Sequence, residues 1–157
     1  MNSSDAGIKL PLLQLPEITP TLSQKDGKVW IFDALRKKDL VLTPEEWVRQ
    51  HWISFLIQHQ SFPKGLVGLE KGLKYNQLQK RTDLLVYDQE GKPYLLIECK
   101  APQVKLSQST VEQACLYHSR LQTRFLVLSN GLKHICLEWD SEVNSFKQLK
   151  TFPPAPN

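Results

Sequence analysis

Two strand-like runs in the middle of the chain carry acidic residues that a β-hairpin would bring face to face. The first run covers residues 82–87 and the second covers residues 94–100. Residues 88–93 between them are rich in turn formers, and Gly91 lies near the centre of the expected turn. The two runs are therefore predicted to form an antiparallel pair of strands.

A turn centred on residues 90 and 91 sets the register of this pair. The predicted opposed pairs are Tyr87 with Tyr94, Leu85 with Leu96, and Asp83 with Glu98. Because side chains alternate along a strand, Lys100 shares the face of Glu98 while Cys99 points to the other face. Opposed Cβ atoms lie roughly 5 Å apart, so both carboxylates can bind one divalent cation, and without a cation they repel each other. The pattern predicts a site for a hard metal ion with an ammonium group beside it.

The same residues belong to a longer series of motifs. Asp83 is followed by Glu98-x-Lys100 and then by residues 101 and 102 (AP). The other motifs are residues 42–50 (LTPEEWVRQ), residues 80–83 (KRTD), Gln113-x-x-x-Tyr117 and residues 129–131 (SNG). From about Asp33 to about Gly131 the chain resembles the PD-(D/E)xK nuclease superfamily, and specifically the N-terminal domain of type I restriction endonuclease motor subunits. Small stand-alone proteins carry the same domain.

The resemblance implies a Mg²⁺-dependent endonuclease that hydrolyses the phosphodiester bonds of DNA, with Mn²⁺ as a substitute for Mg²⁺. It implies that Asp83, Glu98 and the backbone carbonyl of Cys99 bind the metal ion. Lys100 is expected to orient the attacking water or to stabilise negative charge, and if desolvated it could serve as the base. The alternative role for Lys100 is a salt bridge to Glu98.

Further catalytic residues are expected on two helices. Gln113 and Tyr117 lie four residues apart on one helical face, and the resemblance places them beside the metal ion. The alternative is that Gln113 is an ordinary surface residue and Tyr117 is a half-buried aromatic residue. Related nucleases often carry an additional acid on the first helix, and Glu45 is the candidate here. The alternative for Glu45 and Glu46 is a favourable interaction with the helix dipole.

Positive charge gathers around the predicted site. The formal net charge is +4, which permits nucleic-acid binding without demonstrating it. The predicted DNA-binding residues are Lys71, Lys74, Lys80, Arg81 and Lys105. A solvated loop surface is the alternative. Two other functions compete with a DNA nuclease. One is a catalytically silent module that binds DNA or docks a partner, and the other is a nuclease that acts on RNA. The intact Asp-Glu-Lys set favours the DNA nuclease.

The composition indicates an ordinary globular protein. The chain has 157 residues, of which 41% are hydrophobic and 23% are charged. We expect one domain over residues 1–157, with an extended segment at 1–16, a folded core at 17–150 and a proline-rich tail at 151–157. The chain lacks long apolar runs and a signal-peptide start, so we expect a cytoplasmic protein without membrane contact. The sequence has no Walker-type motif, so translocation and target recognition would need separate motor or specificity proteins, and a homodimer remains an open alternative.

The expected elements give a mixed α/β fold with a restriction-endonuclease-like core. Its order is helix, three antiparallel strands, helix, strand, with helices on the faces of a mixed sheet. The expected ranges are a helix from Thr43 to about Gln60, strands near 66–73, 82–87, 94–100 and 124–128, and a helix capped by Ser109 that ends near Leu121. We also expect two hairpins outside this core. One is N-terminal, with its turn at residues 26 and 27, and the other is C-terminal, formed by residues 133–139 and 146–149.

Overall fold

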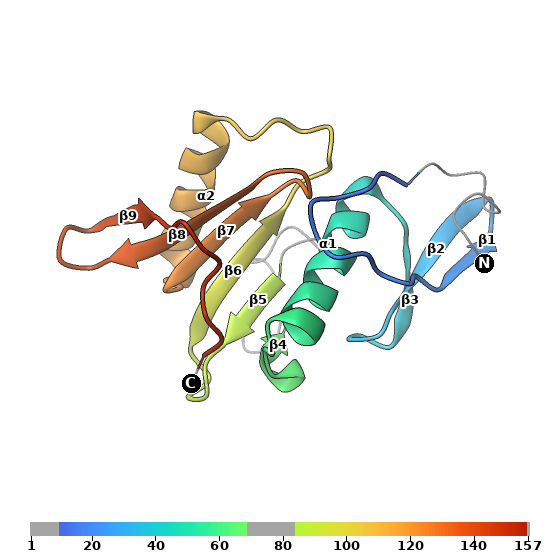
Figure 1. Cartoon of the computed structure of the whole chain (residues 1–157), viewed down its shortest axis with the longest axis horizontal. Helices are drawn as coiled ribbons and strands as arrows, with labels where there is room; N and C mark the ends of the chain where they lie inside the picture. Colours follow the sequence, from blue (N-terminus) through green and yellow to red (C-terminus); the bar gives the residue numbers. More distant parts are fainter. Residues whose placement is uncertain (1–9, 69–83, 157) are drawn as a thin grey trace.

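The computed structural model describes residues 10–68 and 84–156, apart from the side chains of residues 117–121. It contains two β-sheets, and helix α1 lies between them (Figure 1). The smaller sheet is antiparallel, with strand order β1-β2-β3, from β1 (Leu22–Lys25), β2 (Lys28–Asp33) and β3 (Lys38–Val41).

The larger sheet is mixed and has the strand order β4-β5-β6-β7-β8-β9. Strands β6 and β7 run parallel and the other described pairs run antiparallel. Its strands are β4 (Val67–Gly68), β5 (Leu84–Tyr87), β6 (Pro93–Cys99), β7 (Phe125–Ser129), β8 (His134–Asp140) and β9 (Ser145–Gln148). The expected mixed α/β class is confirmed, as is the C-terminal hairpin.

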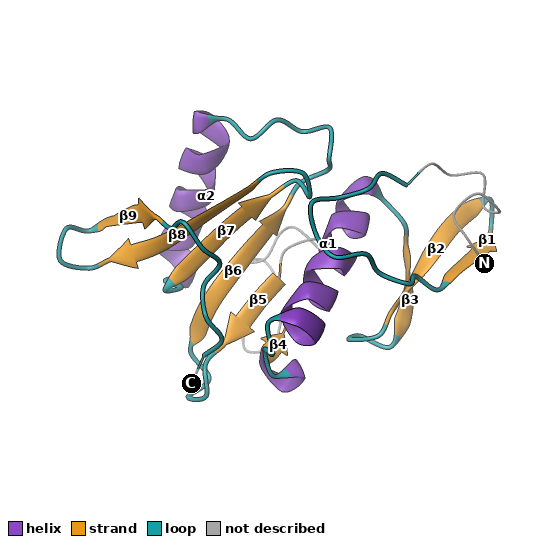
Figure 2. Cartoon of the chain, viewed as in Figure 1, coloured by secondary structure: helices purple, strands orange, loops and turns teal. Residues whose placement is uncertain are grey.

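The helices cover both faces of the larger sheet (Figure 2). They are α1 (Pro44–Ser54), which continues as a π-helical turn, η2 (Phe55–His59), and α2 (Gln108–Leu121); a short 3₁₀ turn, η3 (Lys64–Leu66), precedes β4. One core cluster joins Val48 and Trp52 of α1 to Ile97 of β6, and a second joins Ala114 of α2 to Leu96. Within the described residues, no helix has the length and apolar character that a membrane span requires.

Helix α1 begins at the predicted cap. The Thr43 hydroxyl accepts a hydrogen bond from the backbone N–H of Glu46 at 3.0 Å, and Pro44 occupies the first turn. The Glu46 carboxylate does not complete a capping box, because it accepts hydrogen bonds from Arg49 and Gln50 instead. The cap of α2 also differs from the expectation. Ser107 and Thr110 exchange hydrogen bonds there, so the helix begins at Gln108, before the predicted Ser109 cap.

The central hairpin has the predicted register except at its turn. Leu84 pairs with Ile97 and Leu85 pairs with Leu96, but Tyr87 pairs with Pro93 rather than with Tyr94. The shift leaves Tyr94 as an extra residue in β6 between Pro93 and Leu95, so the loop between the paired residues is one residue shorter than predicted. Asp83, whose predicted partner is Glu98, lies outside the described residues.

The N-terminal hairpin turns at Asp26 and Gly27, both with positive φ, as expected. Its first strand starts at Leu22, and β3 completes a three-stranded sheet that was not predicted. The segment Lys38–Val41 offers a single apolar pair next to a run of basic residues, which is a weak strand pattern. Pairing with β2 supplies the backbone hydrogen bonds that make it a strand.

Both ends of the described chain are held to the core. Gln14 donates its backbone N–H to the carbonyl of Gly131 at 2.7 Å, and the Trp47 indole N–H donates to Pro11 at 2.9 Å. Gly131 has φ +84°, which favours glycine, and a Cβ there would lie 2.8 Å from the end of the Leu13 side chain and would displace it. At the other end, Phe152 stacks on Trp52, with ring centroids 5.4 Å apart.

A buried ion cluster connects the smaller sheet to α1. The Arg49 guanidinium has no exposed surface, and its Nη1 lies 2.8 Å from Asp33 Oδ2 and 2.8 Å from Glu46 Oε2. Gln50 donates to the same two carboxylates at 3.1 and 3.0 Å. Arg49 Nε and Nη2 are buried without a hydrogen-bond partner among the described residues. The cluster therefore depends on the charge of Arg49 to compensate two buried acids.

Asp33 is the most fully bonded member of this cluster. Its Oδ1 accepts the backbone N–H groups of Leu35 and Arg36, each at 2.8 Å. Burial by itself raises the pKa of Asp33, but the hydrogen bonds from Arg49 and the backbone and the charge of Arg49 outweigh that effect, so the pKa lies below its usual value. The ionised carboxylate thus holds the turn after β2 against α1.

Replacing Arg49 by methionine should strongly destabilise the fold. Arg49→Met leaves Asp33 and Glu46 buried without a counter-charge, which should lower the free energy of unfolding by about 3–5 kcal/mol in urea denaturation at neutral pH. Arg124→Met is the matched control, because Arg124 is 64% exposed in its ion pair with Glu138 and should cost less than about 1 kcal/mol. Equal costs for the two variants would contradict the role of the cluster.

His51 should make folding stability depend on pH. Burial lowers the pKa of His51 below its usual 6.5, and its hydrogen bond to the Trp47 carbonyl only partly offsets this. Protonation therefore favours the unfolded state, so this contribution is complete above about pH 6.5 and is lost as the pH falls below it. Thermal unfolding between about pH 5 and 8 should show the loss, and His51→Gln should reduce it. An unchanged slope in that variant would refute the assignment.

Candidate active site

The candidate site lies where β6 ends. Glu98 is 6% exposed, and it is followed by the buried Cys99 and the half-buried Lys100. The parallel pairing of β6 with β7 brings Cys99 beside Ser129, and Lys100 donates its backbone N–H to the Ser129 carbonyl at 2.7 Å. Backbone hydrogen bonding thus continues past the end of the strand and fixes where the Lys100 side chain begins.

The two faces of β6 have different neighbours. Cys99 and Ile97 pack in the cluster that contains Val48 of α1, whereas Leu96 packs in the cluster on the α2 side. Strand alternation places Glu98 on the α2 side with Leu96. The structure places Cys99 on the α1 side, and the position of Glu98 on the opposite face follows from strand alternation alone.

A hollow of about 630 Å³ adjoins this end of β6. Two of its lining residues are Glu45, in the first turn of α1, and Lys100. Glu45, predicted as an additional acid on the first helix, therefore lies on the same hollow as Lys100. The full lining is Trp30, Arg36, Asp39, Leu40, Val41, Thr43, Glu45, Glu46, Cys99 and Lys100. Glu46 also reaches this wall, but its carboxylate is held by Arg49.

The segment after β7 supports the loop that follows Lys100. Asn130 donates its side-chain amide N–H to the Val104 carbonyl at 2.7 Å, and its Oδ1 accepts the backbone N–H groups of Leu132 and Lys133. Lys105, a predicted DNA-binding residue, is exposed on the supported loop. The Ser-Asn-Gly motif therefore has a positioning role that its short sequence did not reveal.

The other predicted residues are placed less fully. Gln113 is exposed on α2, and the side chain of Tyr117 is not described. The residues outside the described ranges are Asp83 and the basic residues Lys71, Lys74, Lys80 and Arg81. Their contribution to the site stays a prediction.

The described donors suit a hard metal ion but form only part of a metal site. Over residues 10–68 and 84–156, no group of three or more histidine, cysteine, aspartate or glutamate side chains could hold a metal ion. The carboxylate of Glu98 and the backbone carbonyl of Cys99 would supply oxygen donors, which Mg²⁺ prefers. This donor chemistry fits the predicted ion, and Asp83, the predicted second carboxylate, lies outside the described residues.

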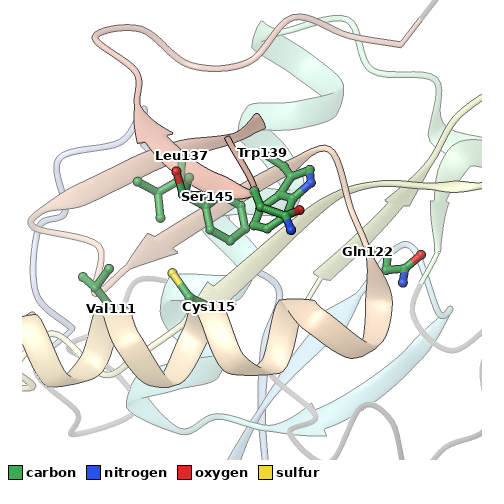
Figure 3. Close-up of a pocket in the computed structure, with 8 residues that line it drawn as sticks. Val111, Cys115, Gln122, Leu137, Trp139 and Ser145 are labelled. Atoms are coloured by element: carbon green, nitrogen blue, oxygen red, sulfur yellow. The ribbon is translucent and has the colours of Figure 1, made fainter. Parts of the chain in front are cut away.

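A second hollow lies away from these residues, between α2 and the β8–β9 hairpin (Figure 3). Its volume is about 860 Å³, and Val111, Cys115 and Leu137 contribute to its lining. Burial raises the pKa of the Cys115 thiol, and Glu112 adds to the shift, which disfavours the nucleophilic thiolate. The shape of this hollow is mainly a consequence of packing α2 beside the hairpin.

Sequence reasoning missed the contribution of the smaller sheet to the site. Trp30, Asp39 and Val41 line the hollow, and Asp33 anchors the sheet to α1. The apolar run over residues 29–32 indicates a strand, and in the structure burial alternates along it. That pattern carries no information about which distant element the exposed face adjoins.

Comparison with known protein families gives the chain its classification. The family model described as type I restriction enzyme R protein N terminus (HSDR_N) matches residues 44–153. The match begins at the first residue of α1 and includes Glu98, Lys100 and Asn130. Searches of curated proteins and of solved structures gave no significant match. The chain belongs to the family of type I restriction enzyme R protein N-terminal domains.

Proposed function

We propose that this protein is a Mg²⁺-dependent DNA endonuclease of the PD-(D/E)xK type. The observation that carries the proposal is that Glu45 of α1 and Lys100, two residues after the buried Glu98, line one hollow at the end of β6. Membership in a restriction-enzyme family supports DNA as the substrate. A surface that only docks a partner has no need for a buried acid at a strand end with a lysine two residues later.

Glu98, Asp83 and the backbone carbonyl of Cys99 are proposed to hold Mg²⁺, with Mn²⁺ as a substitute. When bound, the ion would acidify a water molecule and stabilise the charge that develops on the phosphate. The burial of Glu98 supports this assignment, because a carboxylate in low-dielectric surroundings gains more from a cation than an exposed one does. Lys100 follows Glu98 by two residues and lines the hollow together with Cys99.

Lys100 is proposed to act on the attacking water or on the phosphate. Its backbone is fixed by the hydrogen bond to Ser129, so the flexible part is limited to the side chain. A lysine ammonium is a compact point charge with several donors, which suits contact with a phosphate oxygen or a water molecule. Glu45, across the hollow, can accept a hydrogen bond from a water molecule and so help to orient it.

The wider surroundings of the site are proposed to bind the DNA backbone. The residues assigned to this role are Lys71, Lys74, Lys80, Arg81 and Lys105, of which the exposed Lys105 is described. Gln113 and Tyr117 are proposed to contact the substrate from α2. Separate motor or specificity proteins, or a second copy of the chain, would supply target choice, and the reaction would take place in the cytoplasm.

The first test is cleavage of supercoiled plasmid by purified protein in Mg²⁺, Mn²⁺ or EDTA. Cleavage should need the metal ion, and Glu98→Gln should reduce it by at least about a hundredfold and weaken metal binding in calorimetry, because it removes an anionic ligand while keeping the side-chain size. Asp83→Asn should behave alike. Glu112→Gln, on the exposed surface of α2, is the control and should stay active. Folded wild-type protein without any cleavage would favour the silent docking module.

Replacing Lys100 should separate catalysis from metal binding. Lys100→Ala should leave the metal affinity equal or higher, since a positive charge is removed, while turnover falls by at least roughly a hundredfold. Lys133→Ala, at an exposed position after β7, controls for the loss of charge alone. Turnover of Lys100→Ala within a factor of a few of wild type would exclude the proposed role.

A further inference from the structure

The outward face of the smaller sheet carries aromatic and apolar side chains that the proposed chemistry does not use. Trp30 is half-buried, Phe32 is 41% exposed and Val41 is 36% exposed. Trp30 pairs with Val41 across the strands, and Phe32 follows two residues after Trp30, so the three side chains share one face. The opposite face is buried, because Val29 and Ile31 pack there against Trp47 of α1. The contacts of the buried face with α1 therefore hold the sheet in place, and its outward face is left accessible.

The aromatic group is accompanied by positive charge. Lys25 and Lys28 are paired at the hairpin end of the same face, and Lys25 Nζ lies 4.7 Å from the centroid of the Trp30 ring. The Trp30 indole N–H donates to the Lys25 carbonyl at 3.1 Å, which fixes the ring. Asp39, opposite Phe32, is the acidic residue on this face. Negative ligand groups would therefore lie toward the lysines rather than toward Asp39.

This face continues into the hollow of the candidate site. Trp30 and Val41 line that hollow together with Lys100. A ligand lying across the aromatic side chains would therefore reach the lysine proposed to act in catalysis. The smaller sheet is held in this position by the buried contacts between Asp33 and Arg49.

We propose that the outward face of the smaller sheet, formed by Lys25, Lys28, Trp30, Phe32 and Val41, binds an unpaired strand of the nucleic-acid substrate and leads it to Lys100. The inference rests on the proposed function and adds a substrate class, DNA with single-stranded character next to the cleaved bond. Exposed rings on a sheet stack on unpaired bases, while neighbouring lysines neutralise the phosphates. Bases inside a duplex are already stacked on each other, so an intact duplex cannot use the rings in this way.

The test is a binding measurement in EDTA, which excludes metal-dependent cleavage. Fluorescence anisotropy with a short labelled single strand of mixed sequence should give tighter binding than with the matching duplex. Phe32→Leu, which keeps apolar bulk without a ring, should weaken single-strand binding about tenfold, whereas Phe32→Tyr should retain it. Val143→Ala, at a position 66% exposed in the β8–β9 turn, is the control and should bind as wild type does.

Charge is tested separately from stacking. Lys25→Gln combined with Lys28→Gln should reduce the slope of log affinity against log salt by about 1.4 for a single strand, while Lys92→Gln, at the tip of the β5–β6 hairpin, should leave it unchanged. Equal binding by Phe32→Leu and wild type, or a preference for duplex, would overturn the inference even if cleavage is observed. Absent cleavage together with the expected binding pattern would overturn the nuclease proposal and leave this binding face supported.

Discussion

The arrangement of the candidate site depends on one buried charge, the guanidinium of Arg49. Two carboxylates from different elements, Asp33 at the end of β2 and Glu46 in α1, can be buried only because this cation compensates them. The interaction therefore joins the smaller sheet to the first turn of α1. That turn carries Glu45, and the sheet carries Trp30, so both walls of the hollow are placed by the same contact.

The second constraint is the parallel pairing of β6 with β7. Parallel strands end at the same edge of a sheet, so the residues that follow each of them meet there. Lys100 follows β6 and Asn130 follows β7, and backbone and side-chain hydrogen bonds connect these segments to their neighbours. Polar residues gather at this edge because each strand interior is apolar and buried. The site is thus a consequence of topology more than of any single local motif.

Local patterns predicted much of this fold. Thr43 and Pro44 marked the start of α1, and the turn formers before Pro93 marked the central hairpin, because capping and turn chemistry involve residues close in sequence. The alternation along β6 also predicted that Cys99 points away from the face of Glu98, and Cys99 packs with Ile97 on the α1 side, because side chains two residues apart share a face. The extra residue in β6, Tyr94, was not predicted, since the same turn formers are compatible with loops of different length.

Long-range arrangements were less accessible. Strand β3 and the partners of Arg49 were missed, because a strand of weak pattern forms only when β2 pairs with it, and because Asp33 meets Arg49 only after both elements have packed. Glu46 suited a capping box on sequence grounds, but a buried arginine is a stronger partner for its carboxylate than an exposed N–H. The resemblance to nucleases identified Glu45 as an acid of interest, and the hollow that it shares with Lys100 supports that choice.

The central claim is that the acids at the end of the central hairpin hold a divalent metal ion beside Lys100. A crystal structure of the protein soaked in Mn²⁺, with anomalous differences measured at a wavelength where manganese scatters strongly, tests this claim most directly. The account predicts an anomalous peak from a manganese ion bound by Asp83 and Glu98. This peak should disappear in crystals of the Glu98→Gln variant. A well-ordered Glu98 in soaked crystals with no anomalous density beside it would contradict the account.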